Sequence, residues 1–367
     1  MRVGILGSRG IPNDYGGFEQ FAQYLSLGLA AKGCEVSVYN SHNHRYKKSK
    51  WNEINIIHRY DPEYLVGQAG QFIYDLNCIL DSRKRGFDII LQLGYTTSSI
   101  WGRLHHPKAK VLYNMDGIEW KRSKYNRIVQ SFLKYAEKLG VKYSAELIAD
   151  NIVIQEYFQE KYRRKASYIP YGAGIFDNPN QEILTGYNLE PYRYNLIIAR
   201  FQPDNNTDML LSGVENSTNE NPILVIGKYS NSYGKYLKNR FTDRRIRFLG
   251  GIYDITALSN LRFFSSIYFH GHSAGGTNPS LLEAMASSCL ICAYDCSFNK
   301  AVLGTNSMYF KSSDDVTEIL NRDVKKSDHD SFITNNIEVI RNQYSWDKVI
   351  DDYYQCFRQA LRLRNSD

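Results

Sequence analysis

Short apolar runs alternate along the chain with longer stretches in which apolar and polar residues recur at helical spacing. In the first half the apolar runs read RVGILG, EVSVYN, INIIHRY, FDIILQL, KVLYNM and AELIAD. Helical spacing separates them at about residues 17–33 and 68–85. Strands that alternate with helices of this length predict a parallel, doubly wound sheet.

The second half of the chain repeats this pattern. Its apolar runs are YNLIIAR, PILVIG, IRFLG, SIYFHG and LICAY, and a helix is expected from residue 346 onward. The sequence therefore predicts an α/β fold of two Rossmann-like doubly wound domains facing a central cleft, over residues 1–172 and 173–345. In such sheets ligands bind at the carboxyl ends of the strands.

Composition agrees with a folded protein of two domains. The chain has 367 residues, 43% of them apolar, and a net charge of +7. No run approaches the roughly 18 uncharged apolar residues of a membrane span. MRVGILGSRG reads as a strand and a turn rather than a signal peptide, so a cytoplasmic location is expected.

Three cysteines lie close together in CLICAYDC, at Cys289, Cys292 and Cys296. A metal or redox site would use such a group, and a buried strand would also accept cysteines as small apolar residues. No fourth ligand or second CxxC accompanies them, which favours the strand. The one D-x-D motif lies in the polar segment KKSDHDSF. No essential metal is expected.

A glycine-rich loop follows the first strand in GSRGIPNDYGGFEQF, with Gly16 and Gly17 just before a helix. Glycines allow a ligand to approach the backbone closely, and the amides of a helix N-terminus favour anions. A plain structural turn is the alternative. The spacing is not GxGxxG and no acid closes a dinucleotide site, which argues against a dehydrogenase.

A second small-residue loop leads into a helix in HGHSAGGTNPSLLEAMASS. Ser280 and Glu283 match the capping box, which needs no ligand. Capping alone does not explain the preceding Gly275, Gly276, Thr277 and Asn278, whose amides suit a diphosphate. Glu283 would then accept hydrogen bonds from the hydroxyls of a ribose.

Two further residues stand at the ends of expected strands. Arg200 ends NLIIAR, where it could grip phosphate oxygens or be an ordinary surface arginine. Asp116, after VLYNM, could orient a sugar hydroxyl, act as a base or cap a turn.

Residues 121–142 gather Lys and Arg along an expected helix, with Trp120, Ile128, Phe132 and Leu133 interleaved. A basic amphipathic helix can lie on anionic lipid, and a solvated face on a core-packed helix is the alternative. Nucleic acid is a poorer fit, because the rest of the chain is not strongly basic.

These motifs resemble those of the GT-B glycosyltransferases of retaining family 4. The resemblance is carried by ARFQPDNN, VIGK and GGTNPSLLEAMA, and the stretches GILGSRGIPNDYGGFE and YNMDGIEWKRSKYN resemble bacterial polysaccharide rhamnosyltransferases. It implies that residues 1–172 form an acceptor-side domain and residues 173–345 a nucleotide-sugar-binding domain. It also implies that the terminal helix, residues 346–367, packs back on the first domain.

The resemblance assigns roles to individual residues. Glu283 matches the ribose-binding acid, Arg200 the residue that grips the diphosphate, and Gly16 and Gly17 the loop that faces the phosphates. The remaining matches are Ile252 and Tyr253 for the base, and Gly276, Thr277 and Asn278 for the diphosphate.

The chain departs from the family pattern at two positions. Gly275 stands where the first acid of the family is found, and Asn205 stands where a lysine is usual. Lys228 is the candidate for the missing charge.

The implied activity is transfer of L-rhamnose from dTDP-rhamnose to a lipid-linked saccharide, with no metal or other cofactor, at the inner face of the plasma membrane. Two alternatives remain, a sugar-nucleotide 2-epimerase on the same scaffold and a non-catalytic protein that binds sugar nucleotides.

Overall fold

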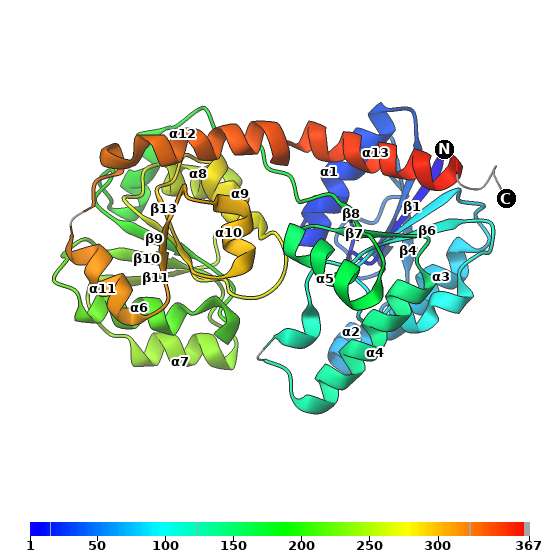
Figure 1. The fold of residues 1–367 in the computed structure, drawn as a ribbon, viewed down its shortest axis with the longest axis horizontal. Helices are drawn as coiled ribbons and strands as arrows, with labels where there is room; N and C mark the ends of the chain where they lie inside the picture. Colours follow the sequence, from blue (N-terminus) through cyan, green and yellow to red (C-terminus); the bar gives the residue numbers. More distant parts are fainter. Residues whose placement is uncertain (15, 123, 323, 363–367) are drawn as a thin grey trace. The chain divides into compact units, whose positions relative to one another are not determined.

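The computed structural model describes residues 1–14, 16–122, 124–322 and 324–362, which form two units, each built on its own sheet (Figure 1). Unit 1 comprises residues 1–121 and 125–172 and the terminal helix α13 (Trp346–Arg362). Unit 2 comprises residues 173–345, and residues 122 and 124 are grouped with it. No helix in the described part of the chain is long and apolar enough to cross a membrane.

The sheet of unit 1 has the strand order β3-β4-β2-β1-β5-β6-β7-β8. All its pairs are parallel except the short β3–β4 hairpin. Because helices lie against both faces of a sheet of this kind, its central strands are buried almost throughout. The strands are β1 (Arg2–Leu6), β2 (Glu35–Ser41), β3 (Lys50–Trp51), β4 (Ile54–Arg59), β5 (Ile89–Leu93), β6 (Lys110–Asn114), β7 (Glu146–Ala149) and β8 (Ser167–Tyr168).

The helices of unit 1 include the terminal helix, which packs on the first one. A Cβ at Gly28 would come within 2.4 Å of Ile350, and the rings of Tyr24 and Trp346 stack with centroids 4.4 Å apart. The other helices are α1 (Gly17–Ala31), α2 (Glu63–Val66), α3 (Gly70–Ser82), α4 (Arg127–Tyr143) and α5 (Ile152–Tyr162), with 3-10 turns at Gly67–Ala69, Ser99–Leu104 and Glu119–Lys121.

Unit 2 contains an all-parallel sheet of order β11-β10-β9-β12-β13-β14. Its strands are β9 (Asn195–Ile198), β10 (Ile223–Ile226), β11 (Ile246–Gly250), β12 (Tyr268–His270), β13 (Ile291–Tyr294) and β14 (Met308–Phe310). Its helices are α6 (Thr207–Asn216), α7 (Ser232–Arg240), α8 (Ile255–Phe263), α9 (Pro279–Ala286), α10 (Ser297–Leu303), α11 (Ser313–Asn321) and α12 (Asp330–Val339). Shorter helical turns lie at Gln181–Tyr187, Pro203–Asn205, Lys326–His329 and Ile340–Tyr344.

The predicted fold class, two doubly wound parallel sheets, is confirmed. One predicted helix differs: residues 68–85 contain a 3-10 turn and then α3, which ends at Ser82. The break before α3 falls at Gly67, whose φ of +61° leaves the α-helical region. Cys292 lies in β13 and is a free, buried thiol, as the strand interpretation predicts.

Candidate functional site

The strand order of unit 2 defines one crevice at the carboxyl edge of its sheet. The connection after β9 runs to β10 on one side, whereas β12, which follows β11 in the chain, lies on the other side of β9. This reversal is a topological switch point, and open α/β sheets bind ligands outside the strand ends at such a point. The loops that follow β9 and β12 are therefore the first place to look for a site.

Hydrogen bonds fasten these two loops together. Asn205 Oδ1 and His272 Nδ1 lie 2.8 Å apart, and Asn206 Nδ2 donates to the carbonyl oxygen of Gly271 at 2.8 Å. The amide of Ser273 donates to the carbonyl oxygen of Asp204 at 2.9 Å. The loops form one continuous rim, because their own polar groups are bonded to each other.

The cationic residues predicted for the site stand on this rim and on the neighbouring strand ends. Arg200 follows β9 and is exposed. Its carbonyl oxygen accepts a hydrogen bond from Asn205, and its side chain has no hydrogen-bond or ion-pair partner among the residues that the structure describes. Lys228 follows β10, with Nζ 5.3 Å from the ring centroid of Tyr253, which follows β11 beside the half-buried Ile252. The residues predicted for unit 2 thus follow the four adjacent strands β11, β10, β9 and β12, the last of which leads into the loop of Gly276 and Thr277.

The loop between β12 and α9 requires glycine where the family pattern has an acid. Gly275 has a φ of +118°, and a Cβ there would lie 3.0 Å from His272 Nε2. A glutamate would be strained in this backbone conformation and would crowd His272. Gly276 and the buried Thr277 continue the loop to the start of α9.

The capping box between Ser280 and Glu283, one of the two alternatives that the sequence left open, is not formed. The N-cap of α9 is Asn278, whose Oδ1 accepts a hydrogen bond from the amide of Ser280 at 2.9 Å, and Pro279 occupies the first helical position. Proline suits that position because it has no amide hydrogen to satisfy. The helix therefore begins early enough to place Glu283 in its second turn, free of any capping role.

Glu283 instead makes an ion pair inside unit 2. Its Oε2 accepts a hydrogen bond from Nη2 of Arg262 at 2.5 Å, where the Arg262 side chain is 4% exposed and that of Glu283 is 32% exposed. Burial alone would lower the pKa of Arg262, but the charge of Glu283 raises it overall. Arg262 thus fixes one carboxylate oxygen of a side chain that still reaches the surface.

Two more hydroxyl groups extend this ion pair into a network. Arg262 Nη2 also donates to Ser280 Oγ at 3.3 Å, and Ser280 Oγ lies 2.9 Å from the hydroxyl oxygen of Tyr268. The network joins α8, β12 and α9, so the orientation of Glu283 depends on three elements.

The histidines of the FHGHS segment are neutral. Burial, helped by Arg262, lowers the pKa of His270 to about 3, and its Nε2 has no hydrogen-bond partner in the described residues. Burial also lowers the pKa of His272 far below its usual value, with neighbouring cations, Arg200 among them, adding to the effect. The two histidines therefore add no positive charge to the site, whereas Arg200 and Lys228 do.

Unit 1 holds the other predicted residues. Asp116 follows β6 with a φ of +50°, and its amide donates to Asn114 Oδ1 at 3.0 Å. Gly16 is the N-cap of α1 with a φ of +123°, and Gly17 is the first residue of that helix. A Cβ at Gly16 would lie 2.0 Å from Oε2 of Glu19, so this N-terminus already holds a carboxylate from the chain itself.

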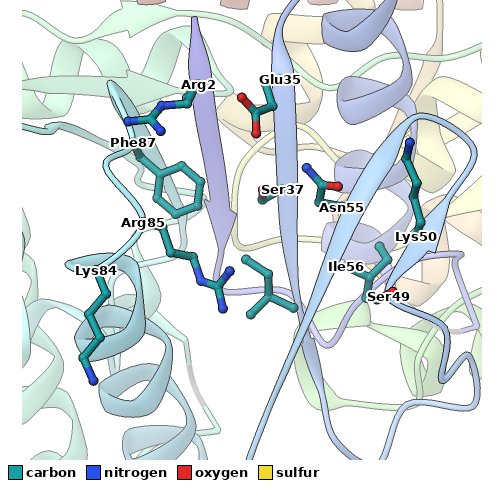
Figure 2. A pocket seen from close by; sticks show the side chains of 11 residues that line it. Arg2, Glu35, Ser37, Ser49, Lys50, Asn55, Ile56, Lys84, Arg85 and Phe87 are labelled. Atoms are coloured by element: carbon teal, nitrogen blue, oxygen red, sulfur yellow. The ribbon is translucent and has the colours of Figure 1, made fainter.

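A pocket of about 510 Å³ in unit 1 lies away from these residues (Figure 2). Arg2 and Glu35, the first residues of β1 and β2, line it, which places it at the amino ends of the strands. Arg85 points into it but is bonded to Asp81. Its lining holds one carboxylate, that of Glu35, and no carboxylate pair, histidine or cysteine, so it suggests no chemistry.

The described residues contain no group of three or more His, Cys, Asp or Glu that could hold a metal ion. Sequence reasoning missed Arg262, His270 and His272. The one available signal was the charge of Arg262 between the apolar residues of ALSNLRFF, because a charge in such a run indicates a buried partner.

A family model described as "Domain of unknown function (DUF1972)" matches residues 1–174. No curated protein matches the chain by sequence.

Several solved structures share its fold. Sucrose-phosphate synthase from Thermosynechococcus elongatus has a TM-score of 0.81 at 13% identity, with 99% of each chain covered. Anabaena Alr3699/HepE in complex with UDP and glucose has a TM-score of 0.75 at 12% identity, covering 98% of this chain and 99% of that one. WaaG, a glycosyltransferase involved in lipopolysaccharide biosynthesis, has a TM-score of 0.68 at 14% identity, with 96% and 99% covered. The chain has the GT-B fold of these enzymes.

Proposed function

We propose that the protein is a retaining, metal-independent glycosyltransferase. It moves L-rhamnose from dTDP-rhamnose to a lipid-linked saccharide during the synthesis of a bacterial capsule, cell wall or O-antigen polysaccharide. The observation that carries this proposal is the pair of features at the switch point of unit 2. Arg200 follows β9 with an exposed side chain that has no partner in the described part of the chain. Glu283, one-third exposed and bonded to Arg262, belongs to the helix after the adjacent strand β12.

These two side chains suit the two polar parts of a nucleotide sugar. The guanidinium of Arg200 and the amides that begin α9 favour the diphosphate. Glu283 accepts hydrogen bonds from ribose hydroxyls, and its second oxygen is held in place by Arg262. Tyr253 offers an exposed ring to the base, with Lys228 beside it.

In the proposed reaction, the bond from C1 of the sugar to the diphosphate oxygen breaks while the acceptor oxygen bonds to C1 on the same face. The electron pair of the broken bond leaves with the diphosphate, whose oxygen takes the acceptor proton. Arg200 and the α9 amides stabilise the charge that develops on this leaving group. Asp116 of unit 1 is assigned to an acceptor hydroxyl, which it orients while the diphosphate takes the proton.

The solved relatives support a sugar-nucleotide donor without fixing the base. The HepE structures contain UDP, UDP with glucose, or UDP-glucose. The proposed thymidine nucleotide rests on the resemblance of GILGSRGIPNDYGGFE and YNMDGIEWKRSKYN to rhamnosyltransferases. A lipid-linked acceptor places the enzyme at the inner face of the plasma membrane, where the basic residues of segment 121–142 would contact anionic lipid.

The test uses a panel of thymidine, uridine and guanosine diphosphate sugars. Binding of each sugar nucleotide is measured by thermal shift, and turnover is measured by nucleotide release with and without a lipid-linked saccharide. Arg200→Ala should lower turnover by about 10²–10³-fold, as expected for the loss of a group that stabilises transition-state charge. Arg244→Ala is the matched control, because Arg244 is an exposed arginine of unit 2 paired with Glu220. Near-full turnover of Arg200→Ala would refute the phosphate assignment.

The same panel separates the two alternatives. A sugar-nucleotide 2-epimerase would release a changed nucleotide sugar without any acceptor. A non-catalytic binding protein would be stabilised by the donor and release nothing with any acceptor.

A further inference from the structure

An uncharged, exposed segment precedes α3 in unit 1. Six consecutive residues, 64–69, are all exposed, and they begin with Tyr64, Leu65 and Val66. Leu65 is 65% exposed. Single exposed apolar side chains are ordinary on a protein surface, but three in succession within a run that has no charge are not.

Further apolar side chains continue this surface onto α3 and α4. Ile73 on α3 is exposed, and Ile128 on α4 is 81% exposed. The two helices are neighbours, since the rings of Phe72 on α3 and Phe132 on α4 have centroids 5.6 Å apart. Helix α3 also packs against α2. The exposed apolar residues therefore belong to one side of unit 1.

The exposed face of α4 adds positive charge. Arg127, Lys134, Lys138 and Lys142 are all exposed and recur at helical spacing. The one acid of this helix, Glu137, is buried, where its Oε1 accepts a hydrogen bond from Lys161 at 2.8 Å. No acid of α4 therefore offsets the four cations.

We propose that these residues form a docking surface for an anionic lipid bilayer. The docking surface consists of the apolar residues Tyr64, Leu65, Val66, Ile73 and Ile128 and the cations Arg127, Lys134, Lys138 and Lys142. The apolar side chains enter the boundary between headgroups and acyl chains, and the cations contact lipid phosphates. The purpose of this contact rests on the proposed function, since a lipid-linked acceptor is confined to the bilayer.

Charge complementarity selects the bilayer over a second copy of the chain. The chain itself carries a net charge of +7, so the cationic face of α4 is repelled by another copy and attracted by anionic lipid. Apolar side chains beside cations on a surface helix are the arrangement that binds at a membrane interface.

Co-sedimentation of the full chain with vesicles tests the docking surface. The vesicles contain phosphatidylcholine either alone or with 30 mol% phosphatidylglycerol, at low and high salt (on the order of 0.05 and 0.5 M). Wild type should bind the anionic vesicles and bind the neutral ones much more weakly. Equal binding to both, or no binding to either, would overturn the proposal.

Two variants separate the two parts of the docking surface. Leu65→Ser/Val66→Ser should weaken binding to anionic vesicles roughly tenfold, because the apolar insertion is lost. Arg127→Glu/Lys138→Glu should weaken it by about 25-fold or more, at about fivefold per cation, and only at low salt. Tyr236→Ser and Arg244→Glu are the matched controls, because both residues are exposed in unit 2. Variants that bind like wild type, or controls that lose as much, would overturn the assignment.

Two further measurements exclude misfolding and self-association as causes of weaker lipid binding. Far-UV circular dichroism must show that each variant is folded. Sedimentation equilibrium without lipid must give the same mass for all variants, since a mass that falls in the docking-surface variants would identify a second copy as the occupant.

Activity distinguishes a failure of the docking surface from a failure of the proposed function. Nucleotide release with a detergent-solubilised acceptor should be unchanged in both variants. Transfer without lipid binding would refute the docking surface alone, and lipid binding without transfer would refute the transferase alone.

Discussion

Replacing Glu283 with alanine should destabilise unit 2 whether or not the residue binds a ligand. The substitution leaves the guanidinium of Arg262 buried without its carboxylate, and Arg262 is only 4% exposed. Breaking a buried ion pair from one side costs about 3–5 kcal/mol. Because Glu283 is itself 32% exposed, water can enter its place, and we expect the low end, about 3 kcal/mol.

Equilibrium unfolding in urea can measure this loss in one unit at a time. All four tryptophans, Trp51, Trp101, Trp120 and Trp346, lie in unit 1, whereas both units contain helices. Glu283→Ala should therefore lower the urea midpoint followed by far-UV circular dichroism more than the midpoint followed by tryptophan fluorescence. With a slope of about 2 kcal/mol per molar urea, the shift is about 1.5 M.

A double-mutant cycle identifies the cause. Arg262→Met removes the buried cation, so adding Glu283→Ala to it should cost much less than Glu283→Ala alone, with a coupling energy of about 2 kcal/mol. A coupling near zero, or a Glu283→Ala protein as stable as wild type, would refute the reasoning. Glu283→Gln is the better variant for nucleotide binding, because its amide oxygen can still accept a hydrogen bond from Arg262.

Three other changes have expected outcomes in the same unfolding assay. Burial raises the pKa of Asp75 from 3.8 to about 6, so the folded state binds this proton more tightly than the unfolded state does. The free energy of unfolding therefore falls as the pH rises from 4 to 6. Asp75→Asn should remove this pH dependence and raise the free energy of unfolding at pH 7 by up to about 3 kcal/mol. The pKa of His270 is about 3 in the folded protein, so its contribution to stability is full above pH 6.5 and is lost below it at about 1.4 kcal/mol per pH unit. His270→Phe should make the free energy of unfolding less dependent on pH in this range. An unchanged pH dependence would contradict the burial argument. Glu137→Leu should lower the free energy of unfolding by about 3–4 kcal/mol and alter the fluorescence of Trp120, because it removes the hydrogen-bond acceptor of Lys161, Trp120 and two tyrosines. A free energy within about 0.5 kcal/mol of wild type, the scatter of neutral substitutions, would contradict this prediction.

The residues that follow the strands of unit 2 could be predicted from the sequence. The ion pair between Arg262 and Glu283 could not. Arg200, Lys228 and Tyr253 each follow an apolar run, and a parallel sheet brings the carboxyl ends of its strands to one edge. Arg262 and Glu283 meet only because α8 and α9 pack beside each other, which no local pattern specifies.

Two helix-start signals lie close together before α9, and the capping-box alternative used the weaker one. The spacing of Ser280 and Glu283 satisfies the capping-box pattern, but Asn278 followed by Pro279 satisfies a stronger one. Proline at the first helical position fixes the N-cap at Asn278, two residues before Ser280. The asparagine–proline pair was the signal that should have decided the boundary.

The amphipathic segment around α4 divides in the structure into residues with different partners. Leu133 is buried in the core of unit 1, Phe132 packs on Phe72, and Trp120 donates a hydrogen bond to Glu137. Ile128 alone of the four interleaved apolar residues is highly exposed. Periodicity predicts a face, whereas the side chains left exposed depend on the neighbouring elements.

The two ends of the stretch 173–345 run side by side. The amide of Ala173 donates to the carbonyl oxygen of Tyr344 at 2.8 Å, and Ala173 forms a bridge with Ser345. Within unit 1, a Cβ at Gly172 would come within 2.5 Å of Trp346. Residues 173–345 are therefore an insertion whose ends are adjacent, so a few glycines could join residue 172 to residue 346 and leave α13 in place. A protease that cuts one connection would leave the units tethered by the other.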